Sequence, residues 1–296
     1  MHKPIFEGVG TAIVTPFNQI NQINFDRFEE LIRFQIENDV DAIIVAGTTG
    51  EPSTLDASEY KDLVSAAIRL VNGKIPVIVG AGSNNTKEAI DKVKFAESVG
   101  ANAILLVTPY YNKTSQLGLI KHYEAICGSC KLPAIIYNVP SRTGMTIELD
   151  TFAELAKIPN LVAIKEASGN ISYAAKIIAK YGERFDVYSG NDDMIVPMMS
   201  LGAKGVISVA SNVIPDIISD MCEFCFFNNF VEATKLQISY LDLINALFSE
   251  VNPIPVKAAL KIIGFDCGSP RPPLIDLTFD KSAALQKIMW WHKLVK

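Results

Sequence analysis

Short apolar segments alternate with amphipathic segments along the whole chain. Eight of them are rich in Val, Ile, Leu and Ala, which is a composition typical of buried strands. They span residues 9–14, 42–46, 76–80, 103–107, 134–138, 161–165, 185–188 and 205–208. Because most of these segments are apolar along their whole length, we expect strands that are buried on both faces, as in a parallel sheet.

The segments between these strands have the apolar spacing of helices with one buried face. In residues 25–38, Phe28, Leu31, Ile32 and Ile36 recur at helical intervals. The same spacing predicts further helices at residues 58–71, 86–99, 115–127, 149–157, 172–181, 194–201 and 215–226.

Eight successive strand–helix repeats predict an α/β fold, a (β/α)8 TIM barrel over residues 1–228. Residues 229–296 have helical patterns and predict a C-terminal helical extension that packs on the barrel. The main alternative is a doubly wound open sheet, which would place a glycine-rich phosphate-binding turn after the first strand. Residues 11–17 contain no glycine, so the barrel is favoured.

Composition and charge narrow the classes of partner. Hydrophobic residues make up 49% of the chain, as strands buried on both faces require. The net charge of −5 favours neither nucleic acid nor an anionic membrane surface as a partner. No apolar run approaches the roughly 18 residues that span a bilayer, and residues 1–8 lack the features of a signal peptide. We therefore expect a cytoplasmic protein.

Two C-x2-C pairs, Cys127/Cys130 and Cys222/Cys225, raise the question of a zinc site. The pairs are about 92 positions apart, whereas compact zinc modules separate their pairs by roughly 15–20 residues. Reduced thiols are therefore expected, and neither a metal nor another cofactor.

The chemistry of a (β/α)8 barrel lies at the carboxyl ends of its strands. Lys165 ends the sixth predicted strand and shares one face with Leu161 and Ala163. Burial there would lower the pKa of the amine, and the neutral amine is the form that attacks a ketone to give an imine. The alternative is a lysine that reaches solvent or pairs with Glu166.

Tyr137 and Tyr111 follow the ends of two other strands and are candidates for proton transfer. The three histidines, His2, His122 and His292, all lie away from strand ends. Tyrosines at such positions also serve as amphipathic packing residues, which is the alternative for both.

Small and charged residues at two more strand ends suit carboxylate groups. Thr48, Thr49 and Gly50 form a turn with two hydroxyls and exposed N–H groups. Arg142 offers a planar guanidinium that can hold a second carboxylate through two bonds. A plain turn and a solvated arginine are the alternatives.

A metal-dependent aldolase is a further alternative, because several carboxylates follow strand ends. Such a site would need histidines or paired carboxylates on adjacent strands, and no strand-end histidine exists. This alternative is disfavoured. The carboxylates are Glu51, Glu166, Asp192 and Asp193.

Four motifs together resemble the dihydrodipicolinate synthase / N-acetylneuraminate lyase superfamily, over nearly the full chain. They are Gly47-Thr-Thr-Gly-Glu51, Tyr137-Asn-Val-Pro-Ser-Arg-Thr-Gly144, Ile164-Lys-Glu166 and Gly190-Asn-Asp192. The resemblance is strongest to the dihydrodipicolinate synthase branch, because the lyases usually carry an apolar residue in place of Arg142. Tyr110-Tyr-Asn112 also looks like the synthase pattern.

The resemblance implies condensation of pyruvate with L-aspartate 4-semialdehyde, the first committed step towards diaminopimelate and lysine. It implies a homo-oligomer, a tetramer built as a dimer of dimers, in which Tyr111 reaches a neighbouring subunit. The implied roles are imine formation by Lys165, proton relay by Tyr137, Thr48 and Tyr111, pyruvate carboxylate binding by Thr48 and Thr49, aldehyde binding by Arg142, and a pocket lined by the backbone of Gly190 and Ile207.

Two other functions stay open. One is a pyruvate-dependent aldolase or lyase of the same superfamily that acts on a sugar acid, and Arg142 argues against it. The other is a catalytically silent barrel that serves as a binding or scaffold protein, and the retained lysine, tyrosines and threonine argue against it.

The resemblance also implies a regulatory cleft, for which we expect weak feedback inhibition by lysine. The groups that hold the amino-acid end of lysine are kept as Asn84, Glu88 and Tyr110. The groups around its side chain depart from the sensitive pattern and are here Pro52, Ala57 and Tyr60. Proline has no N–H and alanine no polar group, so the ligand's ammonium would be desolvated without full compensation.

Overall fold

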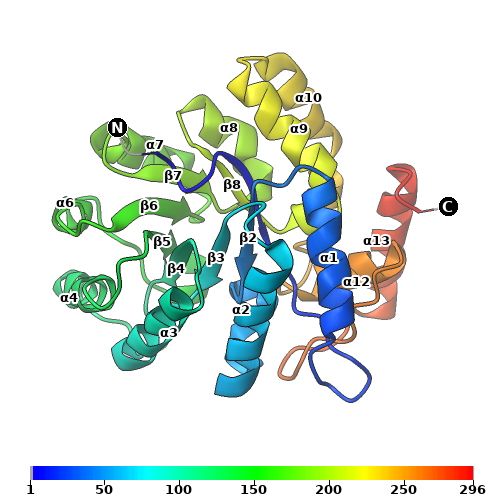
Figure 1. Ribbon diagram of the computed structural model, residues 1–296. Helices are drawn as coiled ribbons and strands as arrows, with labels where there is room; N and C mark the ends of the chain where they lie inside the picture. The colour runs from blue at the N-terminus through cyan, green and yellow to red at the C-terminus, as the bar shows by residue number, and fades with distance from the viewer. Residues whose placement is uncertain (1–2, 296) are drawn as a thin grey trace.

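The computed structural model describes residues 3–295, which form a closed barrel of eight parallel strands (Figure 1). Each strand pairs with the next along the chain, and β1 pairs with β8. The predicted barrel is confirmed, and the doubly wound alternative is wrong. The strands are β1 Gly8–Ala12, β2 Ala42–Val45, β3 Val77–Gly80, β4 Ala103–Val107, β5 Ala134–Asn138, β6 Leu161–Glu166, β7 Asp186–Ser189 and β8 Gly205–Ser208.

Helices surround the barrel and follow the strands in the predicted order (Figure 1). One is shorter than predicted: the pattern at 149–157 narrows to α6, Thr151–Leu155. The N–H of Lys157 already bonds to the carbonyl three residues back, a tighter turn than the α-helix allows. The others are α1 Phe25–Glu37, α2 Ala57–Val71, α3 Thr86–Ser98, α4 Gln116–Cys127, α7 Ile171–Tyr181, α8 Ile195–Ser200 and α9 Pro215–Phe226.

Five short helical turns follow strand ends and were not predicted. They are too short for a periodic pattern to reveal them. They are η1 Thr48–Gly50, η2 Pro52–Thr54, α5 Pro140–Thr143, η3 Asp192–Met194 and η4 Ala210–Asn212.

The first strand was predicted to reach residue 14 but ends at Ala12, because the hydrogen-bond partners of the backbone change there. The N–H of Val14 donates to the side chain of Asn212 at 3.2 Å rather than to a strand. Asn212 also donates to the carbonyl of Ala12. A side chain thus replaces the sheet ladder where β1 leaves the barrel.

The amino-terminal end of the barrel is closed by aromatic side chains. Phe6 stacks on Tyr188, with ring centroids 4.4 Å apart, and the Tyr188 hydroxyl donates to the Phe6 carbonyl at 2.7 Å. Both side chains belong to the apolar cluster inside the barrel. Aromatic side chains therefore close this end of the barrel.

Closure of the barrel brings the backbones of β1 and β8 unusually close together. Gly205 has a φ of +138°, and a Cβ there would lie 1.9 Å from the Gly8 carbonyl oxygen. Only glycine permits this approach.

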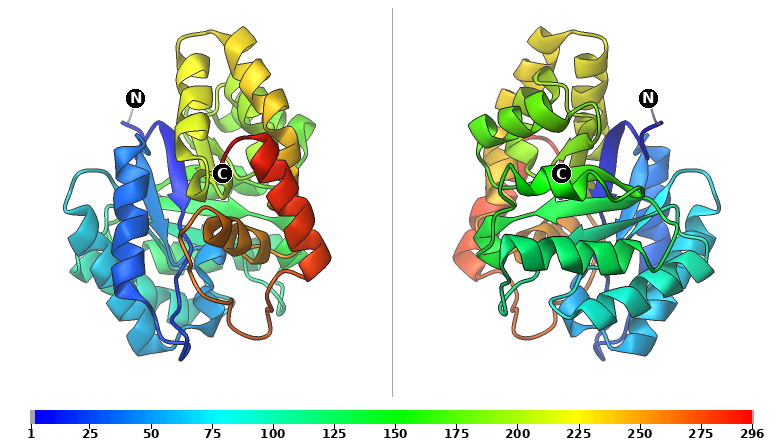
Figure 2. Two further views of the ribbon diagram at one scale, coloured as in Figure 1. Left: turned by 90° about the vertical axis from the view of Figure 1, so that its right-hand side faces the viewer. Right: turned by 90° about the vertical axis from the view of Figure 1, so that its left-hand side faces the viewer.

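The chain after residue 228 continues as helices that pack on the barrel helices. They are α10 Phe230–Ser239, α11 Leu241–Ala246, α12 Ile254–Ile262 and α13 Phe279–Trp291. Helix α10 contacts α8 and α9, whereas α12 lies between α1 and α13 on one side of the molecule (Figure 2). The division at residue 228 stays a prediction.

None of the helices in residues 3–295 combines the length and apolarity needed to cross a membrane. The cysteine pairs lie in or next to α4 and within α9, and all five cysteines carry free thiols.

Candidate active site

A cavity of about 300 Å³ opens at the carboxyl end of the barrel. Lys165 enters it from β6 and Tyr137 from β5. The structure thus brings most of the predicted site residues to one place. The predicted residues that line it are Thr48, Thr49, Tyr137, Arg142, Lys165 and Gly190.

The side chain of Lys165 is almost fully buried. Its Nζ lies 4.3 Å from the centre of the Tyr137 ring. Burial lowers the pKa of Lys165 to about 7, the negative charge of Asp192 opposes this shift, and Arg142 adds to it. A large share of the amine is therefore neutral near pH 7.

Glu166 does not pair with Lys165, because successive strand residues face opposite sides. Its carboxylate accepts from Asn138 Nδ2 at 2.7 Å and from the Ser168 N–H at 2.6 Å. The ion-pair alternative for Lys165 is wrong for this neighbour.

Gly190 leaves room for the stem of the lysine. A Cβ at this position would lie 3.1 Å from Lys165 Cε and 2.6 Å from Ala167 Cβ. Ile207, the other residue expected at the pocket, is fully buried in β8 and is not among the residues that line the cavity.

The threonine turn, η1, is fixed by bonds within and outside itself. Thr49 Oγ1 accepts from Asn252 Nδ2 at 2.9 Å, so the hydroxyl proton of Thr49 remains available for a ligand. Burial raises the pKa of Tyr137, and Arg142 and the Thr48 hydroxyl oppose this shift. Thr48 and Tyr137 line the same cavity.

The residue after this turn is held by a buried ion pair. Glu51 adopts a left-handed conformation with a φ of +54°. Its carboxylate lies 2.5 Å from Lys257 Nζ in α12, and both side chains are almost fully buried. The Glu51 carboxylate also accepts a hydrogen bond from the Arg271 N–H at 2.8 Å. The guanidinium of Arg271 donates two hydrogen bonds to the carboxylate of Glu59. Residues of the C-terminal segment, in α12 and in the loops next to it, therefore hold the threonine turn.

These partners were not predicted from the sequence. Glu51 was considered only as a possible metal ligand, and no role was predicted for Asn252, Lys257 or Arg271. The available signal was the lysine in the apolar helix Ile254–Ile262, since a buried lysine needs a carboxylate.

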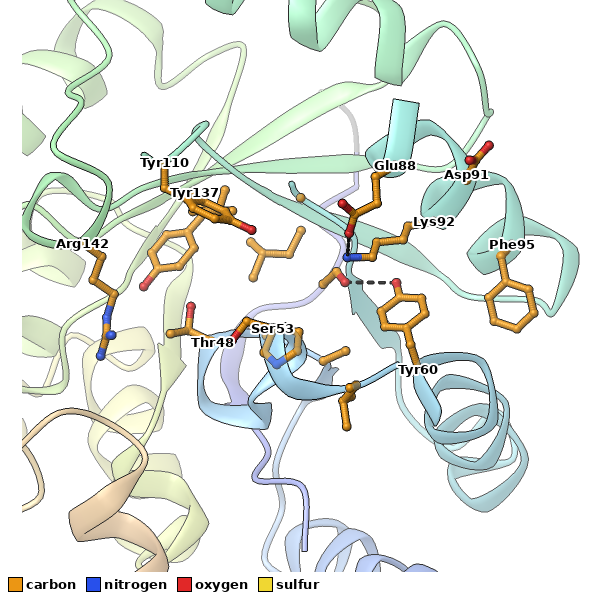
Figure 3. A pocket seen from close by; sticks show the side chains of 18 of the residues that line it. Thr48, Ser53, Tyr60, Glu88, Asp91, Lys92, Phe95, Tyr110, Tyr137 and Arg142 are labelled. Atoms are coloured by element: carbon orange, nitrogen blue, oxygen red, sulfur yellow. Dashed lines mark hydrogen bonds and ion pairs between the residues drawn. The ribbon is translucent and has the colours of Figure 1, made fainter. Parts of the chain in front are cut away.

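Arg142 lies on α5, where it lines this cavity and a second one of about 940 Å³. The next residue fixes the turn, because Thr143 Oγ1 bonds to Thr108 Oγ1 at 3.1 Å. Figure 3 shows Arg142 near Thr48 and Tyr137. These three residues line both cavities, so the second cavity meets the first one here.

The far end of the second cavity lies between α2 and α3 (Figure 3). There Lys92 Nζ lies 2.6 Å from Glu88 and 5.2 Å from the centre of the Tyr60 ring. The Tyr60 hydroxyl donates to the Gly80 carbonyl at 3.0 Å. The carboxylate of Glu88 is thus already paired with a cation of its own helix.

Tyr111 lies outside both cavities. Its side chain is 93% exposed and its φ is +66°, a left-handed conformation. Within one chain, the structure does not bring Tyr111 to Lys165.

Comparisons with known proteins give a consistent result. Residues 5–290 match the model of the dihydrodipicolinate synthetase family. A 4-hydroxy-tetrahydrodipicolinate synthase of Acetivibrio thermocellus is 51% identical over 278 residues, which cover 94% of each chain.

Two solved structures have nearly the same fold, each with a TM-score of 0.96. One is the chloride-inhibited dihydrodipicolinate synthase of Acinetobacter baumannii complexed with pyruvate, which is 40% identical and covers 98% of this chain and 99% of its own. The other is the enzyme of Cyanidioschyzon merolae with lysine bound, which is 42% identical and covers 99% of this chain and 100% of its own.

We predict that the buried pair of Glu51 and Lys257 contributes strongly to stability. Lys257→Met leaves a buried carboxylate unpaired and should lower the free energy of unfolding by about 3–5 kcal/mol. The double variant with Glu51→Gln should recover part of this loss. Urea unfolding measures both effects.

The control for this prediction is the exposed pair of Lys204 and Glu7, 3.3 Å apart. Lys204→Met should change stability by at most about 1 kcal/mol. A Lys257→Met variant as stable as Lys204→Met would contradict the prediction.

Proposed function

Because the chain belongs to the dihydrodipicolinate synthetase family, we propose that it is a lyase that condenses pyruvate with L-aspartate 4-semialdehyde to give 4-hydroxy-tetrahydrodipicolinate. This is the first committed step of diaminopimelate and lysine biosynthesis. The observation that carries the proposal is the buried amine of Lys165, with a pKa lowered to about 7, in a cavity that also holds Tyr137, Thr48 and Arg142.

The proposed reaction begins with the neutral amine of Lys165. It attacks the keto carbon of pyruvate, and the resulting carbinolamine loses water to form an imine. Loss of a proton from the methyl carbon gives an enamine, which attacks the aldehyde carbon of the second substrate. The amino group of that substrate then attacks the imine carbon, closes the ring and releases Lys165.

The surrounding residues have distinct proposed roles. Tyr137 and Thr48, which line the same cavity, pass protons to and from the reacting oxygen. Thr49 binds the pyruvate carboxylate with the hydroxyl proton that its bond from Asn252 leaves available. No cofactor is required by this chemistry.

Arg142 favours this substrate over the sugar acid of the alternative lyase function. The guanidinium at the cavity mouth suits the carboxylate of aspartate semialdehyde through two parallel bonds. A silent scaffold would have no use for a buried lysine with a lowered pKa.

The proposal includes a homo-oligomer, a tetramer of two dimers, and a cytoplasmic location. Support for the oligomer comes from Tyr111, an almost fully exposed aromatic side chain on a left-handed backbone. Such a residue suits contact with a second chain, whose site it would complete as part of the proton relay.

We predict that borohydride reduction with pyruvate labels Lys165 and no other lysine. The labelling rate should rise as pH increases through about 7 and then level off, because only the neutral amine attacks. Peptide mapping identifies the adduct. Lys165→Ala should give no adduct and lose orders of magnitude in turnover.

Lys257 is the internal control for this labelling, since it is equally buried but paired with Glu51. An adduct on Lys257 or elsewhere, or no adduct in the wild-type protein, would refute the mechanism.

Arg142→Leu should impair use of aspartate semialdehyde far more than imine formation with pyruvate. Loss of a charge-assisted contact of about 1.5–3 kcal/mol corresponds to a decrease of about 10–150-fold in kcat/KM for the aldehyde. Arg142→Lys, which keeps the charge but not the two-bond geometry, should lie between. Equal losses in both half-reactions would show that Arg142 is structural.

Feedback inhibition by L-lysine should be weak. A ligand ammonium would have to compete with Lys92 for the Glu88 carboxylate, beside Pro52 and Ala57, which offer no side-chain donor or acceptor. Steady-state titration with L-lysine measures the effect. Lys92→Met frees Glu88 and should strengthen inhibition, whereas strong inhibition of the wild-type protein would contradict the prediction.

A further inference from the structure

Asp192 is a buried carboxylate in the wall of the Lys165 cavity. It follows β7 on the turn η3, and only 2% of its surface is exposed. Its Oδ2 accepts from the N–H groups of Val209 and Ala210, at 3.0 Å each. Its Oδ1 is buried and has no hydrogen-bond partner within residues 3–295. One oxygen is therefore anchored by two backbone N–H groups, and the Ser208 hydroxyl also acts on the carboxylate.

Few charged groups share this cavity with Lys165. Arg142 from α5 adds a positive charge, and Asp193, also on η3, adds a negative charge at the exposed rim. Tyr137 from β5 is the titratable neighbour that faces the amine. Asp192 is thus the one buried carboxylate among the described residues that line the cavity.

Two nearby groups are directed elsewhere. Tyr188, the register partner of Lys165 on β7, donates its hydroxyl to Phe6 at the opposite end of the barrel. Glu166 is bonded to Asn138 and Ser168 on the outer side of the sheet. Neither Tyr188 nor Glu166 is among the described residues that line the cavity.

Imine formation creates a positive charge inside this cavity. The amine nitrogen bonds to the keto carbon and passes one proton to the former keto oxygen. A second proton from the Tyr137–Thr48 relay lets that oxygen leave as water, and the nitrogen then carries the iminium charge. A new cation beside Arg142, shielded from water, is costly without a compensating anion.

We propose that Asp192 is a positioning residue that supplies the fixed negative charge opposite the iminium nitrogen on Lys165. This inference rests on the proposed function, since it concerns the imine of that reaction. The Val209 and Ala210 N–H groups hold the carboxylate in place through Oδ2, and Oδ1 has no hydrogen-bond partner among the described residues. Asp192 and Lys165 line the same cavity. The Asp192 charge already acts on the free amine of Lys165, on which it opposes the effect of burial.

Asp192→Asn separates this electrostatic role from a structural one. The amide oxygen still accepts from the two N–H groups, but the charge is lost. Asp193→Asn is the matched control, since it removes a neighbouring carboxylate that lies exposed at the rim of the same cavity. Asp192→Glu keeps the charge and should retain most of the wild-type behaviour.

The experiment is borohydride trapping of the pyruvate imine as a function of pH. In Asp192→Asn the midpoint of the profile should move down by about 1 pH unit or more, because a nearby negative charge that favours the protonated amine is gone. The plateau rate should fall by about tenfold or more. Asp193→Asn should leave the midpoint unchanged and the rate within about threefold.

Thermal unfolding of each variant shows whether it is folded. If Asp192→Asn does not fold, Ser208→Ala takes its place. Burial raises the pKa of Asp192 and the Ser208 hydroxyl opposes this shift, so removal of the hydroxyl should weaken the charge. The midpoint should then move in the same direction.

An unchanged midpoint in a folded variant would overturn the inference and leave Asp192 a structural residue. A wild-type protein that traps no pyruvate would instead refute the proposed function itself. The two failures are therefore distinguishable.

Discussion

The exclusion of water from the amine of Lys165 is the constraint on which the rest of the site depends. A buried ammonium group loses its hydration, so its proton is bound less tightly. The Phe6–Tyr188 stack contributes by closing the far end of the barrel, and Gly190 contributes by leaving space for the lysine stem. A substitution that let water enter from the amino-terminal end of the barrel, or that displaced the aliphatic part of the Lys165 side chain, would change the pKa of the amine without contacting its nitrogen.

The threonine turn is held by a hydrogen bond and a buried ion pair rather than by apolar packing. The threonine turn is short, and the backbone of Glu51 that ends it is left-handed. Such a backbone conformation persists only where contacts with the surrounding structure stabilise it. The hydrogen bond from Asn252 and the ion pair with Lys257 provide these contacts, so the C-terminal segment is part of the site as much as the barrel is.

Periodicity was sufficient to predict the barrel, because each strand and helix is a local pattern and eight repeats admit few arrangements. The barrel rule then placed Lys165, Tyr137 and Arg142 at one end, and the structure brings them to one cavity. The partners of the turn could not be predicted in the same way. Asn252 is 203 positions from Thr49 in the chain, and local spacing does not reveal which distant helix meets which loop. For the same reason the carboxylate of Glu51 looked like a free ligand.

The bonds that hold the threonine turn also have a consequence for how the protein is made. Thr49 is synthesised 203 residues before Asn252, and Glu51 is synthesised 220 residues before Arg271. The turn lacks these partners for as long as the residues between them are being translated. The amine of Lys165 and a fixed threonine turn therefore come together only after Asn252, Lys257 and Arg271 have left the ribosome.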